Sequence, residues 1–149
     1  MKTIRLLTIG NSFSENAITF LSRLAEADGT VAFDIHRAML GGCTLEKHWN
    51  LAEYTRRAPD YKPYRLTGDE ASAATLQEAL ALQPWDFVTL QQASPKSWLR
   101  ATYEPFLGQL IGEVRALAPT AVAAMLAPAM AWATAALFAP FTADTGPMW

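Results

Sequence analysis

The chain has 149 residues, enough for one domain with a sizeable core, and its 51% apolar content excludes a disordered polymer. A formal net charge of −2, without a run of basic residues, excludes an electrostatic basis for nucleic-acid binding. The single cysteine, Cys43, allows no internal disulfide and is typical of a reducing compartment, so we expect a cytoplasmic protein. The first apolar run is short and interrupted by Arg5, which does not favour a signal peptide.

Strand-like and helix-like segments alternate along the first 127 residues. Apolar runs and alternating patterns predict strands over residues 4–9, 31–36, 86–91 and 121–127. Apolar residues at spacings of three and four predict helices over residues 17–25, 45–57, 69–82 and 103–118, with a loop at 58–68. This alternation predicts a parallel sheet with right-handed crossovers in a three-layer α/β/α domain.

A segment without charged side chains extends from residue 116 to residue 143. Its length would allow a membrane span. However, Pro119, Pro128 and Pro140 interrupt it, and the dominant residue, alanine, drives membrane insertion only weakly. We therefore expect no membrane-spanning helix and no membrane partner.

Polar clusters follow three of the predicted strands. They are Asn11-Ser12, the segment 41–44 (Gly-Gly-Cys-Thr) and the segment 91–94 (Gln-Gln-Ala-Ser). Because parallel strands end at one edge of a sheet, we expect these clusters to converge on one bound ligand.

Two of these clusters resemble motifs of the SGNH (GDSL-like) hydrolase superfamily. Gly-Asn-Ser-Phe at residues 10–13 resembles its first block, with Asn11 in place of the more common aspartate. Gly41-Gly42 resembles the second block, and the strings 9–14 and 41–49 look like a poorly characterised bacterial branch of the superfamily. The resemblance covers about residues 3–115. It implies a flavodoxin-like sheet in which the predicted strands have the order 2-1-3-4.

The resemblance also assigns roles to individual residues. Ser12 would be the catalytic nucleophile, and the backbone N–H groups of Ser12 and Gly42 would bind the oxyanion. The third block normally supplies an asparagine, and here Gln91 or Gln92 stands in the comparable place. Candidate substrate-binding residues near these positions are Asn11, Gly41, His48 and Trp49.

The catalytic Asp-x-x-His block of the superfamily is absent, since no histidine follows His48. We therefore expect a domain at residues 1–118 that lacks the last strand and helix of the fold. Residues 119–149 are rich in alanine and proline, and we interpret them as the product of a frameshift or premature stop. Without a base, the hydroxyl of Ser12 is a poor nucleophile near neutral pH, so we expect this chain to be inactive or very weak.

The implied function is a serine ester hydrolase, with a carbohydrate O-acetyl esterase as the leading hypothesis for its substrate class. No cofactor is expected, and two histidines without further ligands at metal spacing do not favour zinc. The alternative is a non-catalytic module that binds a carbohydrate or another small ligand. A missing edge strand would also favour a homodimer through the exposed edge of the sheet, or a fragment that functions only when paired.

Several candidate residues also have structural interpretations. Ser12 with Glu15 matches a capping box, in which Ser12 would be the N-cap of the next helix. His48 is either a substitute base or a packed side chain, and Cys43 is either a nucleophile or an inert buried thiol. Trp49 and Trp98 either stack on a sugar ring or serve as packing residues.

Overall fold

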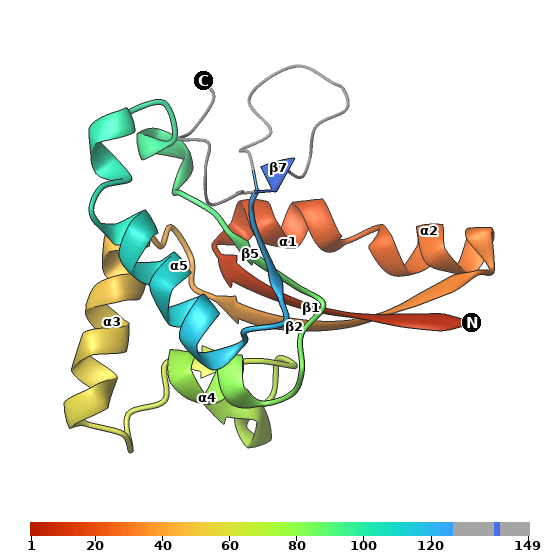
Figure 1. The fold of residues 1–149 in the computed structure, drawn as a ribbon, viewed down its shortest axis with the longest axis horizontal. Coiled ribbons are helices and arrows are strands. Elements are labelled where there is room, and N and C mark those ends of the chain that lie inside the picture. Colours follow the sequence, from red (N-terminus) through yellow and green to blue (C-terminus); the bar gives the residue numbers. More distant parts are fainter. Residues whose placement is uncertain (127–138, 141–149) are drawn as a thin grey trace.

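The computed structural model describes residues 1–126 and 139–140, which form a parallel sheet flanked by helices (Figure 1). The strand order is β2-β1-β5-β6-β7. Its parallel members are β1 (Lys2–Gly10), β2 (Val31–Met39), β5 (Phe87–Leu90) and β6 (Val122–Met125). This confirms the predicted order 2-1-3-4 and the predicted three-layer class. The short β7 (Ala139–Pro140) pairs antiparallel with β6, a strand that the sequence did not predict.

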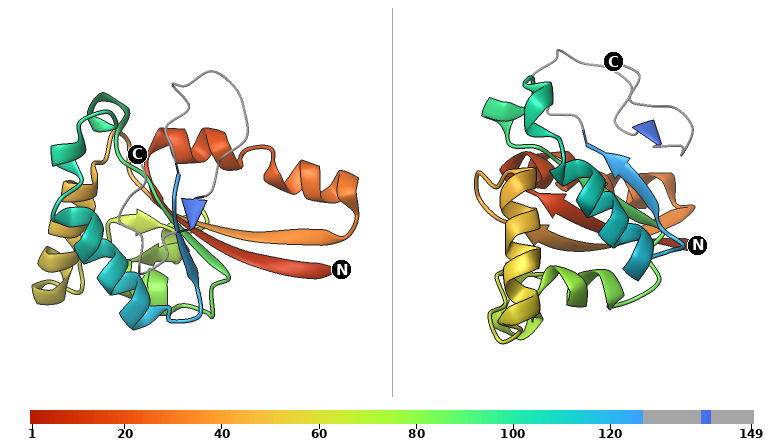
Figure 2. Two further views of the ribbon diagram at one scale, coloured as in Figure 1. Left: turned by 45° about the horizontal axis from the view of Figure 1, so that its top comes forward. Right: turned by 60° about the vertical axis from the view of Figure 1, so that its left-hand side comes forward.

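Helices cover both faces of the sheet (Figure 2). The consecutive helices α1 (Ser12–Ile18) and α2 (Leu21–Asp28) lie along one face. The helices α3 (Leu45–Arg57), α4 (Leu76–Ala81) and α5 (Phe106–Leu117) pack together on the other. The crossovers between parallel strands therefore produce the layers expected of a flavodoxin-like fold.

The main core lies between the sheet and the helices α3, α4 and α5. Leu7 and Ile9 of β1 are fully buried there, at 0% exposure, because alternate side chains of the strand point to this face. Leu110 and Val114 of α5 contribute from the helical side at a spacing of four residues. The indole of Trp85 is also buried, and its N–H donates to the carbonyl oxygens of Ala79 and Leu80.

The prediction of one helix over residues 69–82 was wrong in its first half. Residues Glu70–Ser72 form a 3-10 turn, η1, and Ala73–Ala74 form β4, which pairs with β3 (Tyr64–Arg65). The helix α4 begins only after Thr75, where a capping box with Glu78 satisfies the first free N–H groups. The predicted loop 58–68 consequently contains a strand.

The helical segment after β1 is also interrupted. The spacing of apolar residues over 17–25 predicts one helix, but α1 ends at Ile18 and α2 starts at Leu21. The hydroxyl of Thr19 donates to the carbonyl oxygen of Glu15 at 2.7 Å, and such back-bonding competes with a regular helical turn. In contrast, the fourth strand, predicted over residues 121–127, is confirmed as β6.

Most of the alanine- and proline-rich segment lies outside the described residues. The frameshift hypothesis for residues 119–149 concerns mainly residues 127–138 and 141–149, and it stays a prediction. In the described part of the chain, no helix combines the length and apolarity that crossing a membrane requires.

Candidate functional site

The turns that follow β1, β2 and β5 meet at one edge of the sheet. The amide Nδ2 of Asn11 donates to the carbonyl oxygen of Cys43 at 3.1 Å, which joins the first two turns. The hydroxyl of Ser14 donates to Oε1 of Gln91 at 2.6 Å, which joins the first turn to the third. The third contact runs from the backbone N–H of Leu45 to Oε1 of Gln92, at 3.2 Å. All three of these predicted polar clusters therefore belong to one hydrogen-bonded unit.

Ser12 is the first residue of α1, and its side chain is exposed. The N-cap of α1 is Asn11, whose Oδ1 accepts the backbone N–H of Phe13 at 3.1 Å. Glu15 forms an ion pair with Arg37 instead of reaching back to the cap, so the capping-box interpretation of Ser12 is wrong. Within the described residues, the Ser12 hydroxyl has no hydrogen-bond partner, and capping therefore does not account for it.

The glycine pair lies in a tight turn from Leu40 to Cys43. The N–H of Cys43 donates to the carbonyl oxygen of Leu40 at 3.2 Å, and Gly42 has a φ of 61°, a left-handed conformation that favours glycine. Gly41 and Gly42 are both exposed. In the part of the chain that the structure describes, the backbone N–H groups of Ser12 and Gly42 have no acceptor. Both groups are therefore available to an anionic oxygen.

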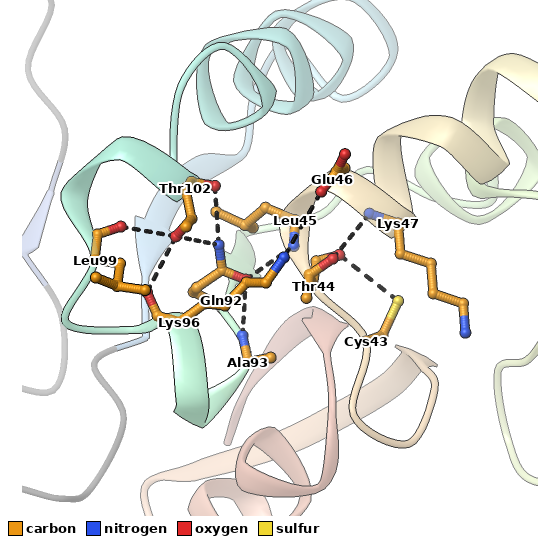
Figure 3. Close-up of polar contacts among 10 residues, drawn as sticks. All are labelled: Cys43, Thr44, Leu45, Glu46, Lys47, Gln92, Ala93, Lys96, Leu99 and Thr102. Atoms are coloured by element: carbon orange, nitrogen blue, oxygen red, sulfur yellow. Dashed lines mark hydrogen bonds and ion pairs between the residues drawn. The ribbon is translucent and has the colours of Figure 1, made fainter.

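The two glutamines differ in what they can offer a ligand. Gln92 is saturated: Oε1 accepts the N–H groups of Leu45 and Ala93, and Nε2 donates to the carbonyl and hydroxyl oxygens of Thr102 (Figure 3). Its amide N–H groups are therefore committed to the fold, which does not suit the predicted oxyanion role. Oε1 of Gln91 accepts a hydrogen bond from the hydroxyl of Ser14, and its Nε2 has no hydrogen-bond partner among the described residues. Gln91 is therefore the less committed of the two glutamines, although its side chain is also buried, at 1% exposure.

His48 of α3 is a buried positioning residue, with a side chain that is 0% exposed. Its Nε2 lies 2.9 Å from the carbonyl oxygen of Gly10, which can only accept, so Nε2 carries the proton. Its Nδ1 lies 2.8 Å from the hydroxyl of Tyr64, which must then donate. Burial lowers the pKa of His48 to about 4. The side chain therefore anchors the end of β1, and both ring nitrogens are occupied by the protein.

Trp49 and Cys43, the remaining candidates, both pack against other parts of the protein. Trp49 is partly buried against the core, and the guanidinium of Arg56 lies 5.4 Å from the centre of its ring. Cys43 is buried at 0% exposure, and this burial raises the pKa of its thiol to about 11. A protonated, inaccessible thiol does not favour the interpretation of Cys43 as a nucleophile. Among the described residues, no group of three or more His, Cys, Asp or Glu side chains could hold a metal ion.

Sequence reasoning missed two supporting residues, Ser14 and Thr102. Ser14 lies beneath Gly10, where a Cβ would overlap with the Ser14 hydroxyl oxygen and lie 3.2 Å from Cβ of Gln91. The glycine at the end of β1 was the available signal for this close approach. Thr102 gave no comparable signal, because its contact with Gln92 depends on the path of the loop after β5.

Comparison with known proteins identifies a family without an assigned function. No curated protein matches this chain significantly. A crystal structure of a DUF4886 family protein from Bacteroides uniformis ATCC 8492 is similar, with 33% sequence identity and a TM-score of 0.67. The similarity covers 83% of this chain and 49% of that one, so this chain spans about half the length of that relative. The family model described as "Domain of unknown function (DUF4886)" matches residues 5–142, and the chain therefore belongs to the DUF4886 family.

Proposed function

We propose that this chain carries the nucleophile and oxyanion groups of an SGNH-type serine ester hydrolase. The observation that carries the proposal is the state of Ser12: its hydroxyl is exposed and free of a capping role at a sheet edge joined by hydrogen bonds. The SGNH relationship itself stays a prediction from the motifs at residues 10–13 and 41–42.

In the proposed reaction, Oγ of Ser12 attacks the carbonyl carbon of an ester. The negative charge that develops on the carbonyl oxygen is stabilised by the backbone N–H groups of Ser12 and Gly42, with Nε2 of Gln91 as a third donor. Removing one such donor typically slows acyl transfer by about 100–1,000-fold. The C–O bond to the alcohol then breaks, and the proton released by Ser12 passes through solvent to the departing alcohol. A water molecule hydrolyses the ester on Ser12, which regenerates the hydroxyl and releases the acid.

Among the described residues, none is evident as the general base that would activate Ser12. His48 is unsuited to this task, because it is buried, hydrogen-bonded through both nitrogens and has a pKa lowered to about 4. The superfamily would place the base in an Asp-x-x-His block, which the printed sequence does not contain. We therefore expect slow turnover from this chain, since an unassisted serine hydroxyl is a weak nucleophile.

A non-catalytic ligand-binding module is the second candidate function. The observation that favours it is the commitment of His48 to the carbonyl of Gly10, which leaves Ser12 without an evident base in the described residues. In this alternative, the same sheet edge binds an ester or sugar without hydrolysing it.

Hydrolysis of a chromogenic acetate ester separates these two candidates. The wild type, Ser12→Ala and Ser22→Ala would be compared, because Ser22 is an exposed serine on the neighbouring helix α2. The esterase proposal predicts a slow rate that Ser12→Ala reduces to the buffer background and that Ser22→Ala retains. Equal rates for all three proteins, together with saturable ligand binding, would favour the binding module.

A further inference from the structure

A cavity of about 290 Å³ lies in the loop that follows β5, and the proposed reaction does not use it. Ser97, Trp98, Arg100 and Tyr103 line it. The volume is just below the range for small-molecule sites, about 300–1,000 Å³. It therefore suits a ligand of modest size, such as one sugar unit.

This loop is fixed to the same sheet edge as Ser12. Its two 3-10 turns, η2 (Ser94–Lys96) and η3 (Arg100–Thr102), are joined by the hydroxyl of Thr102, which donates to the carbonyl oxygen of Lys96 at 3.1 Å. Nε2 of Gln92 donates to the carbonyl oxygen of Thr102 at 3.0 Å. Figure 3 shows this contact. The hydroxyl of Tyr103 also donates to the carbonyl oxygen of Ser97 at 2.8 Å. The cavity wall is therefore ordered before any ligand arrives, which reduces the entropic cost of binding.

Trp98 presents an unusually large apolar surface to solvent, since it is 77% exposed. An indole in this position contributes little to the core and offers a flat face at the cavity. The C–H bonds on one face of a pyranose ring form an apolar surface that can pack against such a ring.

Arg100 supplies the cavity with a positive charge that no ion pair with a described residue compensates. Its side chain is exposed, and it forms no ion pair or hydrogen bond with the described residues. Lys96, in the same loop, has Nζ 3.8 Å from Oε2 of Glu46 and is therefore already paired. A guanidinium fits a carboxylate with two parallel hydrogen bonds, so Arg100 favours an anionic ligand with planar oxygens.

We infer that the cavity between Trp98 and Arg100 is a subsite for acidic sugars, with the ring on the indole and the sugar carboxylate on the guanidinium. This rests on the proposed function, which it deepens by naming uronates that carry an O-acyl ester on a hydroxyl group, with the carboxylate free, as the substrate class. The acidic sugar would orient the ester toward Ser12 at the shared sheet edge.

Binding of D-glucuronate and D-glucose, followed by NMR titration of the tryptophan indole N–H signals, tests this subsite. The wild type is expected to bind glucuronate up to about fivefold more tightly than glucose, the advantage of an accessible charge pair. Arg100→Ala should remove that preference, whereas Trp98→Ala should weaken binding of both sugars. Arg115→Ala, which changes an exposed arginine of α5 outside the cavity, should leave both affinities unchanged.

The subsite proposal is refuted if glucuronate causes no saturable shift of the indole N–H signals, or if Arg100→Ala keeps the wild-type preference for glucuronate over glucose. Both altered side chains are exposed, so folding should be preserved, and circular dichroism checks this. Ser12→Ala should bind glucuronate like the wild type. Binding without serine-dependent hydrolysis would therefore refute the esterase alone, and hydrolysis without binding would refute the subsite alone.

Discussion

Protonation of His48 should destabilise the folded protein in mild acid. Burial lowers the pKa of His48 from 6.5 to about 4, because the charged ring would lose its hydration. Well above pH 6.5, the imidazole is neutral in both the folded and the unfolded chain, and its contribution to stability is complete. As the pH falls from 6.5 toward 4, the unfolded chain takes up a proton that the folded chain does not, and stability is lost.

The size of this effect follows from the difference between the two pKa values. One pH unit corresponds to about 1.4 kcal/mol, so His48 alone should reduce the free energy of unfolding by about 2 kcal/mol at about pH 5. The loss should reach about 3 kcal/mol near pH 4, where the folded state begins to protonate. This is a substantial part of the stability of a typical domain, about 5–15 kcal/mol.

Urea denaturation at several pH values would measure this dependence. In His48→Gln, the amide can still donate to the carbonyl of Gly10 and accept from Tyr64, but it does not titrate. The difference in unfolding free energy between wild type and His48→Gln should therefore change by about 2 kcal/mol between about pH 7 and pH 5. Asn50→Ala, an exposed control on the same helix, should follow the wild type. A difference that does not vary with pH would refute the reasoning.

Three further predictions concern the surroundings of the site. Gly10→Ala should force the hydroxyl of Ser14 away from Gln91 and cost about 1–3 kcal/mol of unfolding free energy, and an unchanged denaturation midpoint would contradict this. Cys43 should react with iodoacetamide far more slowly in the folded than in the unfolded protein, and similar rates would show that the thiol is accessible. Thr75→Ala should lower the free energy of unfolding by about 1 kcal/mol, because it removes the capping box of α4, whereas Thr75→Ser should keep the cap and most of that stability. Thermal unfolding measures both, and equal midpoints for the two variants would contradict this.

Much of the sheet could be predicted from the sequence, because its strands have short-range signatures. The apolar run 4–9 and the polar residues that follow it define a buried strand and its exit without any knowledge of the rest of the chain. The convergence of the turns after β1, β2 and β5 followed from the parallel arrangement alone, and the contacts of Asn11 and Gln92 agree with it.

The roles of individual polar side chains could not be predicted in the same way. Whether His48 faces a ligand or the core depends on Tyr64 and Gly10, which are distant in sequence and meet it only in the folded chain. The commitment of Gln92 likewise depends on a loop whose path has no sequence periodicity. Residues 69–75 resemble a helix in composition, but local caps and the pairing of β3 with β4 override that preference.

Mapping of acetylated residues after incubation with 4-nitrophenyl acetate tests the role of Ser12 most directly. Because 4-nitrophenolate is a good leaving group, acylation of Ser12 by this ester depends less on a base than hydrolysis of the resulting serine ester does, so the acetyl group should accumulate. Peptide mass spectrometry should therefore find an acetyl group on Ser12 well before any on the exposed Ser22. Acetylation of Ser12 that is no faster than that of Ser22 would contradict the assignment of Ser12 as the nucleophile.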